Sequence, residues 1–290
     1  MKKILLLGAN GQLGTDLNLI FSEVRDVQLI NAYRSDIDME FPEQVSPYLE
    51  KRGDFDVVIN CTSYHKTDEC EDFPLKAFSI NSASVAELAK YCNKNNKVLF
   101  HISTDYVFSG KKDIPYSEID REEPLSVYGN SKLAGEHFIQ SYHDKYFIFR
   151  VSSLFGQAGA SGKGGNFVET MIKLAKEGKP LKVVSDQIMS PTHTLDIARA
   201  LCDFIVKDVN QYGIYNCSGE GQCSWYDFAR EIFLKTNMDV ELSPVLSNEY
   251  KTKARRPKYS VLDNRKINQF YPMPLWQEAL EEYLLLKGHI

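Results

Sequence analysis

The sequence contains few cysteines, and their spacing excludes the common metal and redox motifs. There are six among 290 residues and none forms a CxxC pair, so neither a paired-thiol zinc site nor a dithiol redox centre is indicated. A site built from Cys217, Cys223 and His193 would lack paired ligand spacing. We therefore expect reduced, packed cysteines and no bound metal ion.

An excess of positive charge is also missing. The formal net charge is -5, whereas binding to nucleic acid requires a basic face. No apolar run reaches the length of a membrane span. The N-terminal run 4–7, which ends at Gly8, is too short for the core of a signal peptide. We expect a cytoplasmic protein without a nucleic-acid or membrane partner.

What the sequence does contain is an alternation of strand-like and helix-like segments. Short apolar runs typical of buried parallel strands occur at 3–8, 27–32, 56–61, 97–103 and 146–151. Between them lie amphipathic stretches of helical period, most clearly at 75–91 and 126–142. This order predicts an α/β fold, namely a Rossmann-type doubly wound parallel sheet with helices on both faces.

The pattern becomes less regular after residue 151, which predicts a smaller α/β substrate-binding unit. Helices are expected at 166–177, 194–206, 224–235 and 275–286, and short strands at 181–184 and 213–215. The glycine-rich stretch 156–165 is the most loop-like segment. We assign residues 1–152, with roughly 192–216 returning to the first sheet, to a Rossmann domain. Residues 153–191 and 217–290 are assigned to the substrate-binding domain.

The segment GANGQLG (8–14) follows the first strand-like run and precedes a helix. Gly8 permits a tight turn, Gly11 lets the backbone approach a pyrophosphate, and Gly14 allows the helix to pack closely on the strand. The N–H groups at the start of that helix can bind phosphate. The spacing is one residue longer than in the usual dinucleotide fingerprint, but its context predicts nucleotide binding.

The end of the second strand-like run distinguishes between two nicotinamide cofactors. Sites that prefer NAD usually place Asp or Glu there, to bind the ribose 2′-hydroxyl. Residues 31–35 include no carboxylate, and Arg34 can pair with a 2′-phosphate. The alternative is that Arg34 is solvated and that Asp36 supplies the acid. We expect NADPH as the cofactor, with NADH as the alternative.

Tyr128 and Lys132 are the candidate catalytic pair, because residues four apart share one face of a helix. A lysine charge about 4 Å from the phenol would lower its pKa by roughly three units at an effective dielectric of about 20. That would bring the phenol into the range useful for acid–base catalysis. Tyr283 and Lys287 have the same spacing, and we interpret them as surface residues. Tyr128 differs because it follows the fourth strand, whose end carries Thr104, and doubly wound sheets bind ligands at such ends.

Several further segments carry a family resemblance together with GANGQLG. They are INCTSYHKTDECE (59–71), STDYVFSG (103–110), YGNSKLAGE (128–136), NFVETM (166–171), VVSDQIMSPT (183–192), SWYDFAREI (224–232) and ARRPKYSVL (254–262). Their order resembles that in dTDP-4-dehydrorhamnose reductases, over essentially the whole chain. The resemblance implies the extended short-chain dehydrogenase/reductase fold. It also implies NADPH-dependent reduction of a 4-keto-6-deoxy nucleotide sugar to the 4-hydroxyl.

The resemblance implies roles for individual residues as well. Tyr128 is the proton donor, Lys132 lowers its pKa and holds the nicotinamide ribose, and Thr104 completes the catalytic set. The expected substrate contacts are Thr104, Asp105, Tyr106, Ser153 and Arg256, with Arg255 as the alternative to Arg256. The expected cofactor contacts are Gly8, Asn10, Gly11, Gln12, Leu13, Arg34, Asp38, Met39, Cys61, Thr62, Ser63, Tyr128 and Lys132.

Two departures from the family pattern concern the sugar pocket. Ser153 stands where the family has a tryptophan beside the sugar, and residues 64–71 include Lys66 in a stretch that usually resembles HTAVDKAE. The loss of an aromatic platform and the gain of a basic residue imply a reshaped pocket. The connection 156–165 is also longer than usual. The sequence has no counterpart of the acidic residues that link some members into magnesium-bridged dimers, so we expect a monomer or a homodimer without metal.

Two other functions stay open at this point. An epimerase or dehydratase of the same fold would keep its cofactor bound, whereas a reductase exchanges it. The family also includes a non-catalytic regulatory subunit of methionine adenosyltransferase, which binds a nicotinamide cofactor and a partner enzyme. The intact set of Thr104, Tyr128 and Lys132 favours an enzyme, whose expected partner is a nucleotide-sugar substrate.

Overall fold

Six parallel strands form one sheet in the part of the chain that the computed structural model describes, residues 1–159 and 165–290. In sheet order they are β2 (Val27–Ala32), β1 (Lys2–Leu7), β3 (Val57–Asn60), β4 (Val98–Thr104), β5 (Tyr146–Val151) and β10 (Gly213–Asn216). Each neighbouring pair is parallel. The order changes direction between β1 and β3, and doubly wound sheets bind ligands at such a point. The predicted fold class is confirmed.

The apolar runs form strands because both of their faces are covered. In β1, Ile4 and Leu6 belong to one hydrophobic cluster, whereas Leu5 and Leu7 belong to another. All four side chains are fully buried. Successive side chains of a strand point to opposite faces, so a continuous apolar run fits a sheet that lies between two helical layers.

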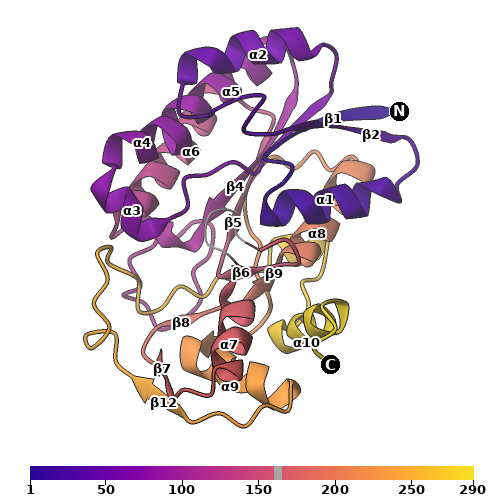
Figure 1. Ribbon diagram of the computed structural model, residues 1–290. Coiled ribbons are helices and arrows are strands. Elements are labelled where there is room, and N and C mark those ends of the chain that lie inside the picture. Colours follow the sequence, from indigo (N-terminus) through magenta and orange to yellow (C-terminus); the bar gives the residue numbers. More distant parts are fainter. Residues whose placement is uncertain (160–164) are drawn as a thin grey trace.

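Figure 1 shows these two layers. One face of the sheet is covered by α1 (Gln12–Ser22) and α8 (Thr194–Val206). The other is covered by α2 (Val45–Arg52), preceded by the short η1 (Pro42–Gln44), together with α5 (Ser84–Lys94) and α6 (Val127–Tyr142). The helices predicted at 126–142 and 194–206 are therefore confirmed.

The segment between β3 and α5 is more broken than its sequence pattern indicates. After α3 (Thr67–Asp72), the helix predicted at 75–91 forms as α4 (Pro74–Phe78), a π-helical turn η2 (Ser79–Ala83) and α5 in succession. Gly135 of α6 packs tightly on the π-helical turn, because a Cβ there would lie 2.3 Å from the carbonyl oxygen of Asn81. Periodicity alone does not reveal this local widening of the helix.

A second group of elements lies below the sheet in Figure 1 and shares a third hydrophobic cluster. Its helices are α7 (Phe167–Lys176), α9 (Trp225–Lys235) and α10 (Trp276–Leu286). Its paired strands are β6 (Leu154–Phe155) with β9 (Thr192–His193), β7 (Leu181–Val184) with β12 (Leu242–Val245), and β8 (Ile188–Met189) with β11 (Cys223–Ser224). The predicted helices and the strand at 181–184 are confirmed. The sequence analysis missed β12, which contains a proline, a residue that weakens any strand pattern.

The interpretation of Tyr283 as a surface residue is wrong. Its side chain is fully buried in the third cluster. Its hydroxyl donates a hydrogen bond to Glu169 Oε1 (2.6 Å) and accepts one from Asn166 Nδ2 (3.0 Å). The spacing to Lys287 does not indicate which face of α10 is buried, and the packing of α10 on α7 and α9 decides that.

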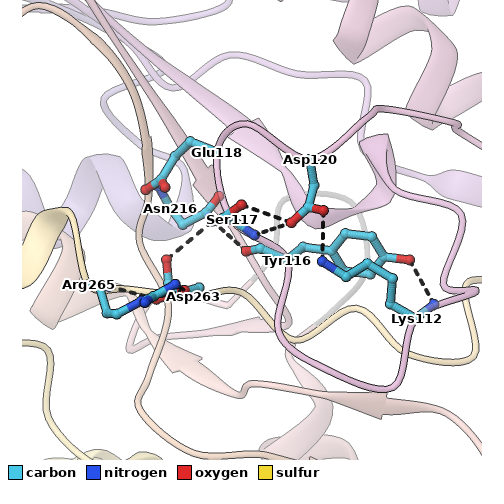
Figure 2. Close-up of polar contacts among 8 residues, drawn as sticks. All are labelled: Lys112, Tyr116, Ser117, Glu118, Asp120, Asn216, Asp263 and Arg265. Atoms are coloured by element: carbon cyan, nitrogen blue, oxygen red, sulfur yellow. Dashed lines mark hydrogen bonds and ion pairs between the residues drawn. The ribbon is translucent and has the colours of Figure 1, made fainter.

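The loop after β4 is fastened to β10 and to the C-terminal part of the chain. The loop begins with the short η3 (Asp105–Val107), and the C-terminal part includes η4 (Ile267–Gln269). Figure 2 shows that the Asn216 side chain donates hydrogen bonds to the carbonyl oxygens of Tyr116 (2.7 Å) and Asp263 (3.3 Å). The Asn216 backbone N–H donates to Glu118 Oε1 (2.9 Å). Among the described residues, no helix has the length and apolarity needed to cross a membrane.

Candidate active site

A cavity of about 1010 Å³ lies at the carboxyl ends of the central strands. The residues predicted to contact cofactor or substrate all line it, with the exception of the alternative Arg255. They are Gly8, Asn10, Gly11, Gln12, Leu13, Arg34, Asp38, Met39, Cys61, Thr62, Ser63, Thr104, Asp105, Tyr106, Tyr128, Lys132, Ser153 and Arg256. The fold thus brings together residues that are spread over most of the sequence.

The glycine-rich turn forms one end of the cavity. Gly8 adopts φ +81° directly after β1, a conformation that favours glycine. A Cβ at Gly14 would lie 2.3 Å from the Gly8 carbonyl oxygen, so α1 can approach β1 only with glycine there. The N-cap residue of α1 is Gly11, which has no side chain to accept a hydrogen bond from the first N–H groups of the helix. These features fit the pyrophosphate of a dinucleotide, which binds to free N–H groups at a helix N-terminus.

Arg34 lies at the edge of this end, and its side chain is 69% exposed. Its guanidinium pairs with the carboxylates of Asp38 (3.1 Å) and Glu40 (3.7 Å). Asp36, the alternative acid, accepts a hydrogen bond from the Tyr33 backbone N–H and does not line the cavity. Arg34 is therefore accessible but partly neutralised by neighbouring acids.

Lys132 is fully buried under the middle of the cavity. Its ammonium donates a hydrogen bond to the Ile102 carbonyl oxygen (2.5 Å) and lies 3.2 Å from His101 Nε2. The other ring nitrogen of His101 lies 3.1 Å from the Asn60 amide nitrogen, and Asn60 Oδ1 accepts two hydrogen bonds from Thr62. Burial lowers the pKa of Lys132 to about 8, against the opposing charge of Glu136.

Hydrogen bonds link Tyr128, Thr104 and Asp105. The Thr104 hydroxyl donates its single proton to Asp105 Oδ1 (3.0 Å), and it accepts a hydrogen bond from the Tyr106 backbone N–H (3.2 Å). A further hydrogen bond joins the side chains of Thr104 and Tyr128. Hydrogen bonds with Thr104 and with Ser63 both lower the pKa of Tyr128 and so favour its ionised form.

The pKa of Tyr128 corrects one expectation. It is raised above its usual value, chiefly by burial and only partly offset by the hydrogen bond to Thr104. The lowering expected from Lys132 is not found, because the Lys132 ammonium is directed to the Ile102 carbonyl oxygen and His101 instead. Tyr128 is therefore a neutral phenol at physiological pH.

Asp105 is almost fully buried. Besides Thr104, the Ser152 hydroxyl donates a hydrogen bond to its carboxylate (3.0 Å). Burial raises the pKa of Asp105 to about 6, although hydrogen bonds from Ser260, Ser152 and Thr104 favour the ionised form. Its carboxylate thus anchors the hydroxyl chain that leads to Tyr128.

Ser153 adopts a left-handed backbone conformation, φ +47°, where β5 gives way to β6. Non-glycine residues rarely occupy this region, and such strain concentrates at functional sites. Its carbonyl oxygen accepts a hydrogen bond from the Thr192 N–H (3.3 Å), which joins the turn to β9. The small side chain lines the cavity at the position where the family pattern has a tryptophan.

Arg256 lines the cavity, whereas Arg255 is exposed outside it. The Arg256 guanidinium is bonded to Asp68 (2.8 Å) and to the Tyr106 hydroxyl. The Tyr106 and Tyr128 rings meet edge to face, with centroids 5.9 Å apart. The geometry therefore favours Arg256 over Arg255 as the contact for an anionic substrate.

Several lining residues were missed by the sequence analysis. They include Tyr64, Lys76, Ile80, Phe167, Thr170 and Trp225. Phe167 and Trp225 lie inside the quoted segments NFVETM and SWYDFAREI, so the motifs pointed to them without specifying their role. Nothing local in the sequence distinguishes Lys76, which reaches the cavity from α4 and pairs with Glu40 (2.6 Å). Of the loop-like stretch 156–165, residues 160–164 lie outside the described chain.

Comparison with known proteins decides the family. Residues 1–287 match the family model described as the RmlD substrate binding domain. The chain is 37% identical over 287 residues to the spore coat polysaccharide biosynthesis protein SpsK of Bacillus subtilis (strain 168), covering 98% of this chain and 97% of the relative. It is 36% identical over 293 residues to the dTDP-4-dehydrorhamnose reductase of Aggregatibacter actinomycetemcomitans, covering 97% and 98%. The chain belongs to the dTDP-4-dehydrorhamnose reductase family.

Its structure is correspondingly similar to a solved member of that family. The dTDP-4-dehydrorhamnose reductase of Bacillus anthracis strain Ames, crystallised in complex with NADP, superimposes with a TM-score of 0.90. That match has 36% sequence identity and covers 99% of this chain and all of the other. The resemblance inferred from the motifs is confirmed.

Proposed function

We propose that this chain is an oxidoreductase that uses NADPH to reduce the 4-keto group of a 4-keto-6-deoxy nucleotide sugar. The dTDP-4-dehydrorhamnose substrate named for its relatives, or a closely related keto sugar, is the favoured substrate. One observation carries the proposal. Thr104, Tyr128 and Lys132 meet at the wall of a cavity whose far end is the glycine turn of α1. The fit of that turn to a pyrophosphate, and the NADP bound to the Bacillus anthracis relative, support the cofactor.

The proposed chemistry assigns one task to each residue. Bound NADPH supplies a hydride to the keto carbon. Tyr128 donates its proton to the keto oxygen, which becomes more basic than a phenolate as negative charge develops on it. Thr104 and Asp105 orient the phenol through the hydrogen bonds described above. Lys132, charged below a pH of about 8, would hold the nicotinamide ribose.

Ser153 is the proposed reason for a difference in sugar preference. A serine in place of a tryptophan leaves more room beside the sugar and removes a flat stacking surface. We infer that the pocket accepts keto sugars bulkier than dTDP-4-dehydrorhamnose, or reduces that substrate poorly. The second group of elements, which contributes Ser153, Phe167 and Trp225 to the cavity, is proposed as the substrate-binding domain.

The test is NADPH oxidation with a panel of 4-keto-6-deoxy nucleotide sugars that carry different bases and different ring substituents. Turnover of at least one member at ordinary enzyme rates is expected. Failure with the whole panel would contradict the proposal. In that case NAD(P) that copurifies in a tight complex would favour an epimerase or dehydratase. Capture of a partner enzyme by the purified chain would favour a binding subunit.

A further inference from the structure

The C-terminal part of the chain is fastened to α3 beside the cavity, although the two are far apart in sequence. Asp68 of α3 contacts two residues of this C-terminal part, Ala254 and Arg256, and Arg256 lines the cavity. Its Oδ1 accepts a hydrogen bond from the Ala254 backbone N–H (3.0 Å), and its Oδ2 accepts one from Arg256 Nη2 (2.8 Å). One turn further along, Asp72 pairs with Lys253 (2.6 Å) outside the cavity.

Arg256 connects this contact to the candidate catalytic residues. Its side chain is only 21% exposed, and its hydrogen bond to Tyr106 places it next to the ring that packs on Tyr128. Two bonds to Asp68, one to the Ala254 carbonyl oxygen and one to Tyr106 engage four of the five N–H donors of the guanidinium, so one donor remains for an anion. A guanidinium held by a carboxylate in a fixed plane is well suited to bind a phosphate group.

The rest of the C-terminal part does not need Asp68 to stay in place. Figure 2 shows its second attachment, where Asp263 accepts a hydrogen bond from Asn216 of β10. Tyr259, Val261 and Leu262 are buried in a hydrophobic cluster with Phe108 of the loop after β4. A substitution at Asp68 should therefore release the Arg256 guanidinium without detaching the segment.

We propose that Asp68 is a positioning residue that holds Arg256 at the cavity wall for the diphosphate of the nucleotide-sugar substrate. This inference rests on the proposed function, because it requires an anionic substrate at that wall. Asp68 acts through Arg256 and does not itself contact substrate. An Arg256 without this partner would keep its charge but lose its fixed orientation, so substrate binding should weaken while cofactor binding persists.

The experiment compares Asp68→Asn with Asp72→Asn, a matched control that breaks an ion pair between the same two segments outside the cavity. Calorimetry measures the binding of dTDP and of NADPH separately, and steady-state kinetics measures KM and kcat for a keto sugar that is turned over. For Asp68→Asn we expect dTDP affinity to fall about tenfold or more and KM to rise similarly, as for one lost charge-assisted contact. NADPH affinity should be unchanged. Asp68→Glu should recover part of the loss, and Asp72→Asn should behave as the wild type.

Unchanged dTDP affinity in Asp68→Asn, or equal losses for dTDP and NADPH together with a lower melting temperature, would overturn the inference. In the latter case Asp68 would serve the fold alone. A third outcome would contradict the proposed function but not this inference: the wild type binds dTDP, Asp68→Asn does not, and neither protein reduces any keto sugar.

Discussion

The order of hydrogen bonds around Tyr128 determines how each residue of the candidate site can act. Thr104 is hydrogen-bonded both to the buried carboxylate of Asp105 and to the Tyr128 phenol. Asp105 itself is held by Ser152 and Ser260. The phenol is thus oriented by a neighbour that is oriented in turn, which is the usual structure of a catalytic constellation.

Tyr128→Phe removes only the hydroxyl that donates the proton. Turnover should fall by about a hundredfold or more, the scale expected for a lost general acid. NADPH affinity should change little. The measurements are kcat on a good substrate and cofactor binding by fluorescence.

Tyr283→Phe is the control: it should lower the free energy of unfolding by about 1–2 kcal/mol because Asn166 and Glu169 lose a buried partner. Its turnover should stay normal, and near-normal turnover of Tyr128→Phe would refute the assignment.

The low pKa of Lys132, about 8, predicts a loss of activity at alkaline pH. Above that pH the ammonium loses its proton, and with it the charge that would strengthen its hydrogen bonds to the nicotinamide ribose, so kcat/KM should decline as pH rises through about 8. Deprotonation of Lys132 should not lower the free energy of unfolding. An unfolded lysine binds its proton up to a higher pH, so this residue adds stability as pH rises from about 8 towards its unfolded value. Lys132→Met should be slow and should lack this decline; a flat wild-type profile up to pH about 9.5 would contradict the prediction.

Arg34→Ala tests the choice of cofactor. Arg34 is an accessible cation at the cofactor end of the cavity, and its loss should reduce the preference for NADPH over NADH by about tenfold. The ratio of the two dissociation constants is the measurement. Arg52→Ala is a suitable control, because Arg52 pairs with Asp36 and does not line the cavity. Wild-type protein that binds NADH as well as NADPH would show that Asp38 and Glu40 neutralise Arg34.

At the level of residues, the sequence identified the walls of the site but not their internal contacts. Motif position pointed to Thr104, Tyr128 and Lys132, and all three line the cavity because each follows or faces the end of a strand. It could not show that His101 lies under Lys132, because this contact depends on strand pairing and burial. Spacing failed for Tyr283, since residues four apart share a face whether that face is buried or exposed.

Among the elements, α1 and α9 show two ways of beginning a helix. The N-terminus of α9 carries a capping box, in which Ser224 accepts a hydrogen bond from the Asp227 N–H and Asp227 reaches back to Ser224. The N-cap residue of α1 is Gly11, which has no side chain and so provides no such acceptor. A helix whose first N–H groups lack a side-chain partner is suited to bind an anion there.

Gly11→Asp should separate stability from cofactor binding. Gly11 has an extended backbone, φ -76° and ψ 174°, which any residue adopts, and a Cβ would lie 3.2 Å from the Gly8 carbonyl oxygen. The free energy of unfolding should therefore change by less than about 1 kcal/mol. NADPH affinity should fall at least about tenfold, because the carboxylate occupies the phosphate position and repels the phosphate.

Ser224→Ala should do the reverse, losing about 1 kcal/mol of stability with unchanged NADPH affinity. Denaturant titration and calorimetry measure both quantities, and normal NADPH binding by Gly11→Asp would exclude the turn as the phosphate site.

Element prediction succeeded where one physical signal dominated and failed where two competed. Continuous apolar runs defined β1 to β5 almost residue by residue, because both faces of the sheet are buried. Helical period did the same for α6 and α8. The π-helical turn Ser79–Ala83 keeps a helical pattern and so could not be predicted from periodicity. β12 depends on pairing with β7, which is distant in sequence, and its proline hides it further.

At the scale of the whole molecule, the cavity is built from both groups of elements. The glycine turn, Thr62 and Lys132 come from the strand–helix units of the sheet, whereas Phe167, Trp225 and Arg256 come from later segments. The sequence indicated that a second unit exists. It did not indicate that α3 and the C-terminal part meet through Asp68, because no local pattern encodes contacts between such distant segments.

A ligand that fills this cavity should stabilise the whole molecule, since it binds only the folded chain. At a free NADPH concentration about 100 times its dissociation constant, the free energy of unfolding should rise by about 2.7 kcal/mol. For a chain of this size that corresponds to a melting temperature higher by roughly 4–5 °C. NADH at the same concentration should raise it less, because it lacks the phosphate that Arg34 would bind. Differential scanning fluorimetry measures the shift, and the Gly11→Asp variant, with its affinity about tenfold lower, should show about half of it or less. An equal shift with NADH and NADPH would argue against the proposed cofactor preference. An undiminished shift in Gly11→Asp would mean that the stabilising nucleotide binds away from the turn of α1.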